Sequence, residues 1–144
     1  SILANASFAA LGVTHPQYGT PHVTRIALGM TPEGHPISLV SDLSTHTKAL
    51  QASQQCGLLV GEPATKGDPL THPRLSIQAK ATFVTRIDGT FKQIRDHYLS
   101  THPKAKLYID FADFNFVQFD ILSADLNGGF GKAFHLLPDD FSKS

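Results

Sequence analysis

Hydroxyl and basic side chains gather in residues 41–48, Ser-Asp-Leu-Ser-Thr-His-Thr-Lys, where a strand-like stretch gives way to a helix-like one. The first turn of an α-helix carries backbone N–H groups without a partner and a partial positive charge. A phosphate is stabilised there, and hydroxyl or ammonium groups beside it add hydrogen bonds. The sequence therefore predicts an anion-binding pocket at this helix start.

Composition limits the kind of protein that holds this pocket. The 144 residues are 41% hydrophobic and 17% charged, which suits one compact domain spanning residues 1–144. Twelve basic and twelve acidic residues cancel without any basic run, so neither nucleic acid nor a membrane is an expected partner. The apolar opening, residues 2–11, is too short to span a bilayer. Cys56 is the only cysteine and cannot form an intrachain disulfide, so we expect a cytoplasmic protein.

Three strand-like stretches and one helix surround the predicted pocket. Residues 23–29 and 36–41 flank a turn that contains Pro and Gly, and this arrangement predicts a hairpin. Residues 43–55 space their apolar side chains loosely as a helix. The apolar run 56–61 is typical of a strand that is buried on both sides.

The second half of the chain shows further strand and helix patterns. Residues 74–85 alternate apolar and polar side chains, as a half-buried strand does, and residues 114–122 alternate with a change of face midway. An amphipathic pattern opens at Asp88 and predicts a helix ending before Pro103, followed by a short helix at 104–108. About six strands and a few short helices predict a mainly β (α+β) domain built as an antiparallel barrel.

Four motifs in order make a wider pattern: the predicted hairpin, residues 41–50, residues 67–75, and the pair Asp110-Phe111 together with the glycine-rich stretch 129–133. Together they resemble the FMN-binding split-barrel family related to pyridoxamine 5′-phosphate oxidase, and within it the haem-utilisation branch. The resemblance runs from about Pro21 to Leu137. It implies a six-stranded antiparallel split barrel with short flanking helices, and a homodimer with one FMN in each cleft between its subunits.

The same resemblance assigns cofactor contacts by matching position. Three residues on one strand and two on its hairpin partner would line the flavin: Thr24, Arg25, Ile26, Val40 and Ser41. Four residues would form the phosphate end: Thr45, His46, Thr47 and Lys48. Arg74 would approach the ribityl chain or the flavin ring.

The sequence departs from the oxidase in two places. His46 and Thr47 stand where the oxidase carries an Arg-Lys pair, so phosphate binding is expected to be weaker or more sensitive to pH. The chain has no Trp and lacks the oxidase's substrate-binding C-terminal segment. Pyridoxamine phosphate is therefore not the expected substrate.

Three hypotheses follow for the function. The main one is an FMN-dependent oxidoreductase acting on a small molecule, in which the cofactor carries the chemistry and no side chain is assigned a catalytic role. The second is a haem-binding or haem-degrading protein of the same fold, in which a histidine or arginine contacts the iron or the propionates. The third is a non-catalytic dimer that kept the barrel without the cofactor.

Other reactive or aromatic residues have plainer interpretations. The eight histidines include no HExxH or i, i+4 pair, so no metal site is predicted, and His46 is the strongest functional candidate among them. Cys56 lies in an apolar run and is expected to be a buried thiol. Phenylalanines 111, 114, 116 and 119 are expected to pack in the core or at a dimer contact.

Overall fold

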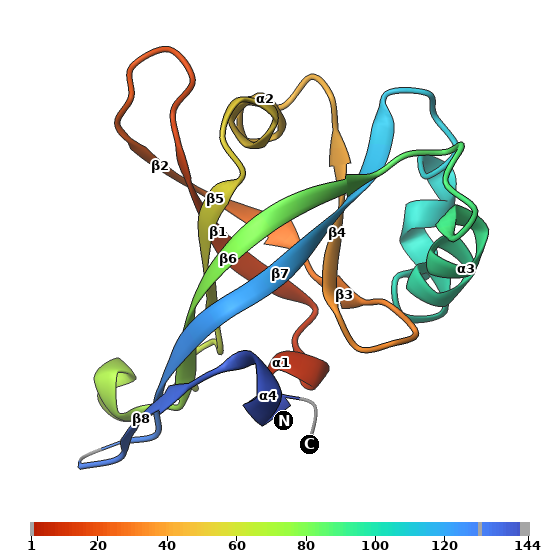
Figure 1. Cartoon of the computed structure of the whole chain (residues 1–144). Coiled ribbons are helices and arrows are strands. Elements are labelled where there is room, and N and C mark those ends of the chain that lie inside the picture. The colour runs from red at the N-terminus through yellow and green to blue at the C-terminus, as the bar shows by residue number, and fades with distance from the viewer. Residues whose placement is uncertain (1, 130, 142–144) are drawn as a thin grey trace.

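One antiparallel sheet, curled into an open barrel, forms the centre of the computed structural model, which describes residues 2–129 and 131–141 (Figure 1). Eight strands make up the sheet in the order β2-β1-β5-β6-β7-β4-β3, with β8 paired to β7. The strands are β1 (Phe8–Thr14), β2 (Pro21–Ala27), β3 (Gly29–Met30), β4 (Pro36–Ser41), β5 (Gln55–Val60), β6 (Arg74–Val84), β7 (Phe114–Asn127) and β8 (Ala133–Leu136). The predicted mainly β split barrel is confirmed, whereas the expected number of six strands is wrong.

Two long strands, β6 and β7, form the spine of the sheet. They pair from Arg74 and Asn127 to Val84 and Phe116, with a bulge between Gln78 and Ala79. Buried and solvent-facing residues alternate along β6, which confirms the strand predicted at 74–85. A bulge increases local twist, and so it helps this pair to bend around the core.

Hydrophobic side chains from the two faces of the sheet fill two clusters. The larger lies inside the barrel and includes Leu11, Leu58, Ile77, Val117 and Phe119. The smaller lies against α3 and includes Ile37, Phe91, Ile94, Tyr98 and Phe116. Strand β7 contributes to both clusters, which confirms the change of face predicted within 114–122. Of the phenylalanines expected to be structural, Phe116 and Phe119 are fully buried, whereas Phe111 is 56% exposed.

Short helices lie around the barrel: α1 (Ile2–Asn5), α2 (Thr45–Ala52), α3 (Phe91–Thr101) and α4 (Pro138–Phe141), with 3₁₀ turns η1 (Pro69–Thr71) and η2 (Pro103–Leu107). Figure 1 shows α2 at one end of the barrel, α1 and α4 at the other, and α3 beside β3 and β4. The helices predicted at 43–55, from Asp88 and at 104–108 are confirmed as α2, α3 and η2, with shifted ends. A paired set of hydrogen bonds from Arg95 to Asp110, 2.8 and 2.7 Å, fixes α3 against the segment after η2.

The predicted hairpin between residues 23–29 and 36–41 is wrong in its pairing. Strand β2 pairs along its whole length with β1, and only the two-residue β3 pairs with β4. The sequence does not predict β1 because small residues, Ala10 and Gly12, occupy its outer side, so no polar residue alternates with the buried ones.

The strand predicted at 114–122 is longer than expected and is followed by β8, a strand that the sequence does not predict. The predicted turn lies between these two strands, where Gly129 has a φ of +116° and Gly128 N–H donates to the Lys132 carbonyl at 2.7 Å. Phe130, which belongs to that predicted turn, lies outside the described residues. Within residues 2–129 and 131–141, no helix is both long and apolar enough to cross a membrane.

Candidate functional site

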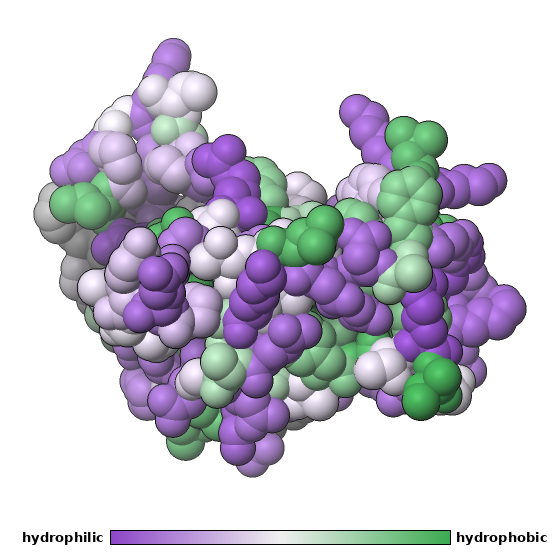
Figure 2. All heavy atoms as spheres, turned by 90° about the horizontal axis from the view of Figure 1, so that it is seen from above, coloured by the Kyte–Doolittle hydropathy of each residue, from purple (hydrophilic) through white to green (hydrophobic). Residues whose placement is uncertain are grey.

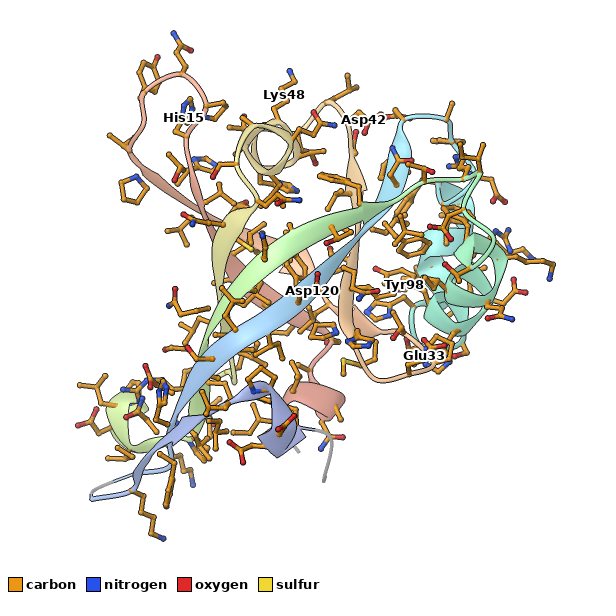
Figure 3. The ribbon with its side chains drawn as sticks, in the orientation of Figure 1. His15, Glu33, Asp42, Lys48, Tyr98 and Asp120 are labelled. Atoms are coloured by element: carbon orange, nitrogen blue, oxygen red, sulfur yellow. The ribbon has the colours of Figure 1, made fainter. Side chains whose placement is uncertain are left out.

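The predicted anion pocket lies where β4 ends and α2 begins, at residues 41–48, which we name the α2 corner (Figure 3). Ser44 precedes the helix in an extended conformation, φ −75° and ψ 143°, and its side chain makes no capping hydrogen bond. Lys48 N–H donates to the Ser44 carbonyl at 3.2 Å and so begins the hydrogen bonding of the helix. The amides of Thr45, His46 and Thr47 precede this bond, so the corner keeps donors that suit an anion.

Two carboxylates stabilise the loop that leads into the α2 corner. Ser41 Oγ donates to Asp113 Oδ2 at 3.0 Å and accepts from Leu43 N–H at 3.2 Å. Asp42 N–H donates to the Asp113 carbonyl at 2.7 Å, and Asn115 Nδ2 donates to Asp42 Oδ1 at 3.0 Å. The Ser41 hydroxyl is therefore already engaged within the chain, and two negative charges beside the helix start weaken its attraction for a phosphate.

The four residues expected at the phosphate end face in different directions. Thr45 and Lys48 are exposed, and Lys48 lies on the outer side of α2 (Figure 3). Thr47 is fully buried, and its Oγ1 has no hydrogen-bond partner in the described part of the chain. Because an anion outside the barrel cannot reach a buried hydroxyl, Thr45, His46 and Lys48 are the members of this group placed to contact one.

His46 is half-buried and lies near His22 of β2. Burial, and to a smaller extent the charge of His22, lowers the pKa of His46 below its ordinary value of 6.5. The His22 ring also meets the ring of His15, which follows β1, edge-on at a centroid distance of 5.7 Å. His46 is therefore neutral at pH 7, and Lys48 is the cation that the corner offers.

The contacts expected along β2 and β4 divide between the two faces of the sheet. Ile26 and Val40 are buried in the core, 5% and 3% exposed, so their side chains cannot contact a ligand unless the core opens. Thr24 shares the inner side of β2 with Ile26, whereas Arg25 faces outward. The Arg25 guanidinium lies over the ring of Phe8, 5.7 Å from its centroid.

Arg74 lies far from the α2 corner within one protomer. Arg74 pairs with Asn127 at one end of β7, whereas Ser41 of the corner pairs with Phe114 at the other end. These two positions of β7 are roughly 40 Å apart along an extended strand. Arg74 Nη1 donates instead to the nearby Leu70 carbonyl at 3.0 Å. One protomer therefore does not bring Arg74 and the corner to the same flavin.

The outer face of the sheet carries a groove that the sequence patterns did not indicate. Four residues, paired strand to strand, form one row across β2, β1, β5 and β6: Val23, Gly12, Gly57 and Gln78. Two hollows of about 500 and 240 Å³ meet at Gly12, Gly57 and Gln78. We name this surface the glycine groove, made of Ala10, Gly12, Val23, Gly57, Leu59 and Gln78.

The backbone does not require glycine at either central position of the groove. A Cβ added to Gly12 would meet its nearest atom at 3.9 Å, and one added to Gly57 at 3.5 Å, both ordinary contacts. A strand glycine that the backbone does not need is typical of a place where another group approaches closely. The isolated glycine inside each of the runs 8–14 and 55–60 is the sequence feature that could have indicated this groove, but neither glycine was among the predicted site residues.

Apolar side chains and one cation lie around the glycine groove. Val23, Leu59 and Leu122 are 68%, 45% and 53% exposed. A further hollow of about 300 Å³ joins the groove through Ala10, Val23 and Leu59, and Arg25 lines it. Glu62 lines the same hollow, so Arg25 is a single cationic donor there and its charge is balanced by a carboxylate. A flat apolar molecule matches the apolar surface, and Arg25 could donate to a carboxylate that it carries.

Cys56 lies beside the groove on β5 and is partly buried. Burial raises the pKa of its thiol to about 11, and Sγ lies 3.7 Å from the Ala79 carbonyl oxygen. The thiol is thus less buried than the sequence predicts. A thiol with a raised pKa is a poor nucleophile at neutral pH. In the part of the chain that the structure describes, no group of three or more His, Cys, Asp or Glu is arranged to hold a metal ion.

The end of the molecule that carries α2 is mostly hydrophilic. Figure 2 shows this end from above, with hydrophobic side chains exposed only in small groups. The two candidate sites differ accordingly: the α2 corner offers hydrogen-bond donors, and the groove offers apolar contact area.

A curled antiparallel sheet that stays open along one edge, with helices at both ends, defines a split-barrel protein. The sequence profile of the CREG beta-barrel family matches residues 6–143, so the chain belongs to this family. The resemblance to the split barrels related to pyridoxamine 5′-phosphate oxidase is thereby confirmed.

The chain is 33% identical over 125 residues to the chloroplastic haem oxygenase HOZ of Arabidopsis thaliana, an alignment that covers 87% of this chain and 37% of HOZ. A haem-binding protein from Mycobacterium smegmatis shares the fold with a TM-score of 0.87 and 22% identity, over 99% of this chain and 57% of that one. An FAD-binding protein from Mesorhizobium loti shares it with a TM-score of 0.66 and 15% identity, over 85% and 86% of the two chains. The chain thus spans less than two thirds of HOZ and of the mycobacterial protein.

Proposed function

We propose that this chain binds haem, and that two copies of it enclose the haem against the glycine groove. Haem is named for HOZ and for the mycobacterial protein, whereas a flavin is named for the less similar protein from Mesorhizobium loti. These similarities support the haem alternative more than the main FMN hypothesis. The observation that carries the proposal is the pair of neighbouring glycines, Gly12 and Gly57, at the centre of an outer surface that also carries the apolar residues Ala10, Val23 and Leu59.

Haem fits the residues of the groove in shape, and Arg25 offers one cation to its carboxylates. The porphyrin is a flat apolar disc, and its two propionates are carboxylates on one edge. Gly12 and Gly57 leave the centre of the groove without side chains, and Val23 and Leu59 offer apolar contact beside them. Burial of such surface stabilises binding by about 25 cal/mol per Å². Arg25, next to Leu59 and Val23, is the cation placed to pair with a propionate.

The chain's own residues would bind, orient and enclose the cofactor. Haem iron, when bound, supplies redox and oxygen chemistry that no side chain of the groove can supply. We further propose that the chain takes part in haem degradation, and the similarity to the haem oxygenase HOZ supports this. Decay of the haem absorption band in the presence of a reductant and O₂ would measure it.

The homodimer belongs to the proposal because the groove is shallow. In a single protomer Val23 and Leu59 stay exposed, and a haem resting on them would keep one face in water. A second copy would cover that face, exclude water and bury both side chains. The resemblance to the split-barrel family implies the same arrangement, with cofactor clefts between the subunits.

FMN is the second candidate ligand, and the α2 corner supports it. The amides at the start of α2 and the exposed ammonium of Lys48 suit a phosphate. The carboxylates of Asp42 and Asp113 and the buried hydroxyl of Thr47 count against strong binding of a dianion there. The same groups can donate hydrogen bonds to a carboxylate, which carries less negative charge than a phosphate dianion. The corner is therefore compatible with a haem propionate as well.

Titration with haem, followed by absorbance, tests the proposal on the unmodified protein and on two glycine variants. Gly57→Val places a branched side chain in the groove at a position where the added Cβ makes an ordinary 3.5 Å contact with the Ile77 carbonyl oxygen, and valine is favoured in strands. We expect Gly57→Val to lower haem affinity at least about tenfold, with the thermal unfolding midpoint unchanged. Gly89 lies in a loop where an added Cβ meets nothing within 4 Å, so Gly89→Val should bind haem normally.

Two outcomes would contradict the proposal. Equal haem affinity in Gly57→Val and in the unmodified protein would show that the groove is not the site. Absence of haem binding, together with FMN binding in a parallel flavin titration, would establish the second candidate instead. The oligomeric state, measured by sedimentation with and without haem, tests the dimer separately.

A further inference from the structure

A separate cavity lies at the edge where the barrel is split. Strand β4 pairs with β7 as far as Gln118, and β8 pairs with β7 from Ala124 onward. Among the described strands, only β6 therefore flanks residues 119–123 of β7. A cavity of about 520 Å³ opens at this gap, within the size range of small-molecule sites. We name it the split-edge cavity, and it shares no lining residue with the hollows of the glycine groove.

The walls of the split-edge cavity come from both ends of the chain and from its middle. Helices α1 and α4 lie on one side and the turn between β3 and β4 on the other, as Figure 1 shows. Leu3 of α1, Met30 of β3, Ile121 of β7 and Phe141 of α4 give the cavity an apolar lining. An apolar lining of this kind favours an organic ligand over an inorganic ion.

Two carboxylates line the same cavity, Glu33 from the turn and Asp120 from β7 (Figure 3). Asp120 is held in place, because its Oδ2 accepts from the Thr82 hydroxyl at 2.9 Å and its Oδ1 accepts from Gln118 Nε2 at 3.1 Å. Within the described residues, no Lys, Arg or His forms an ion pair with either carboxylate. His35 also lines the cavity, and Lys80 lies opposite Asp120 in the pairing of β6 with β7. The cavity thus combines apolar walls with two carboxylates that are not engaged in an ion pair within the described residues.

We propose that the split-edge cavity binds an organic cation, a molecule with an ammonium group on an apolar body. The ammonium would donate to Glu33 and to the remaining lone pairs of the Asp120 carboxylate. The apolar body would pack against Met30, Ile121 and Phe141. A metal ion does not fit, because the described part of the chain holds no ligand group of three or more His, Cys, Asp or Glu. The site is independent of the haem proposal.

Tryptamine and hexylamine are suitable probes, and indole-3-propionate, an acid of similar shape to tryptamine, is the matched control ligand. Binding to the full chain is followed by amide chemical shifts in ¹H–¹⁵N NMR spectra. We expect both amines to shift amides of the cavity lining, Met30, Glu33 and Ile121 among them, and the acid to leave them unchanged. The sign of the ligand charge then decides binding, as the carboxylates predict.

Three variants locate the site. Glu33→Gln removes one exposed charge and should weaken tryptamine binding at least about threefold. Ala4→Trp places a large side chain at the rim of the cavity from exposed α1 and should block both amines. Glu62→Gln removes an exposed carboxylate from a different hollow and should leave amine binding unchanged. Thermal unfolding of each variant confirms that the fold is kept.

The proposal is overturned if neither amine binds up to about 10 mM. Titration to this concentration detects complexes with dissociation constants of about 1 mM and above. It is also overturned if the shifts lie outside the cavity lining, or if indole-3-propionate binds as well as tryptamine. Amine binding that survives both Glu33→Gln and Ala4→Trp would equally exclude this cavity as the site.

Discussion

Ile77 and Gln78 are neighbours in β6, yet they belong to different regions of the molecule. Ile77 is 1% exposed and packs in the larger hydrophobic cluster on the inner face of the sheet. Gln78 is exposed and lines the glycine groove on the outer face. The inner face carries large branched and aromatic side chains, whereas the outer face at the groove carries glycine, alanine, isolated apolar residues and Gln78. The first pattern stabilises the fold, and the second leaves space for a ligand or a second copy of the chain.

The glycines make this difference between the faces informative. A glycine inside a strand costs about 0.5 to 1 kcal/mol relative to alanine, because more backbone freedom is lost on folding. Gly12 and Gly57 lie opposite each other in paired strands, where a Cβ would fit at both positions. No contact within the described part of the protomer requires glycine at these two positions, so the protomer alone does not explain this loss of stability. A ligand or a second copy that packs closely against the outer face would explain why both residues are glycine.

Substitution of the two β6 neighbours should separate the faces most strongly. Ile77→Ala should lower the free energy of unfolding by about 2 to 5 kcal/mol, because it leaves a cavity in the core. Gln78→Ala should change it by less than about 0.5 kcal/mol, because the side chain is exposed. Urea unfolding of both variants measures the difference. Similar losses in the two variants would mean that the outer face is also part of a packed core.

The inner face is the part of the fold that the sequence predicts well. Period-2 alternation reports a strand with one face in an apolar environment and the other in a polar one, and residues 74–85 meet that condition. Strand β1 does not meet it, since Ala10 and Gly12 face outward without being polar. Small residues on the outer face allow close approach of another molecule, but they also remove the apolar–polar alternation by which a strand is predicted from sequence. Because the sequence does not predict β1, β2 is expected to pair with β4, whereas β2 pairs with β1.

The α2 corner shows what residue types alone cannot determine. Residues 41–48 do open a helix whose first turn lacks a side-chain cap, as an anion pocket requires. Whether a hydroxyl faces the pocket depends on the rotation of the helix against the barrel, and this rotation buries Thr47. Ser41 is engaged by Asp113, a residue 72 positions away in the sequence. Such contacts become visible only in the folded chain.

Arg25 and Arg74 provide a sharper test of the outer face. Both are strand arginines, but Arg25 lines a hollow beside the glycine groove, whereas Arg74 donates to the Leu70 carbonyl at a distant edge. Arg25→Ala should weaken haem binding by about 1 to 2 kcal/mol through loss of a propionate partner. Arg74→Ala should leave haem affinity unchanged. Absorbance titrations of both variants decide the matter, and an equal loss in both would remove Arg25 from the site.

The smallest expected effect concerns His46, at the rim where the inner face meets α2. Burial and the charge of His22 hold the pKa of His46 below 6.5, so the folded chain resists protonation there. As the pH falls below about 6.5, the unfolded chain takes up a proton before the folded one does, and the free energy of unfolding decreases. Stability should therefore be fully kept at pH 7.5 and reduced at pH 5. His46→Gln should flatten this dependence in urea unfolding curves recorded across that range. The same slope in the variant and in the unmodified chain would mean that His46 is not the group whose protonation opposes folding.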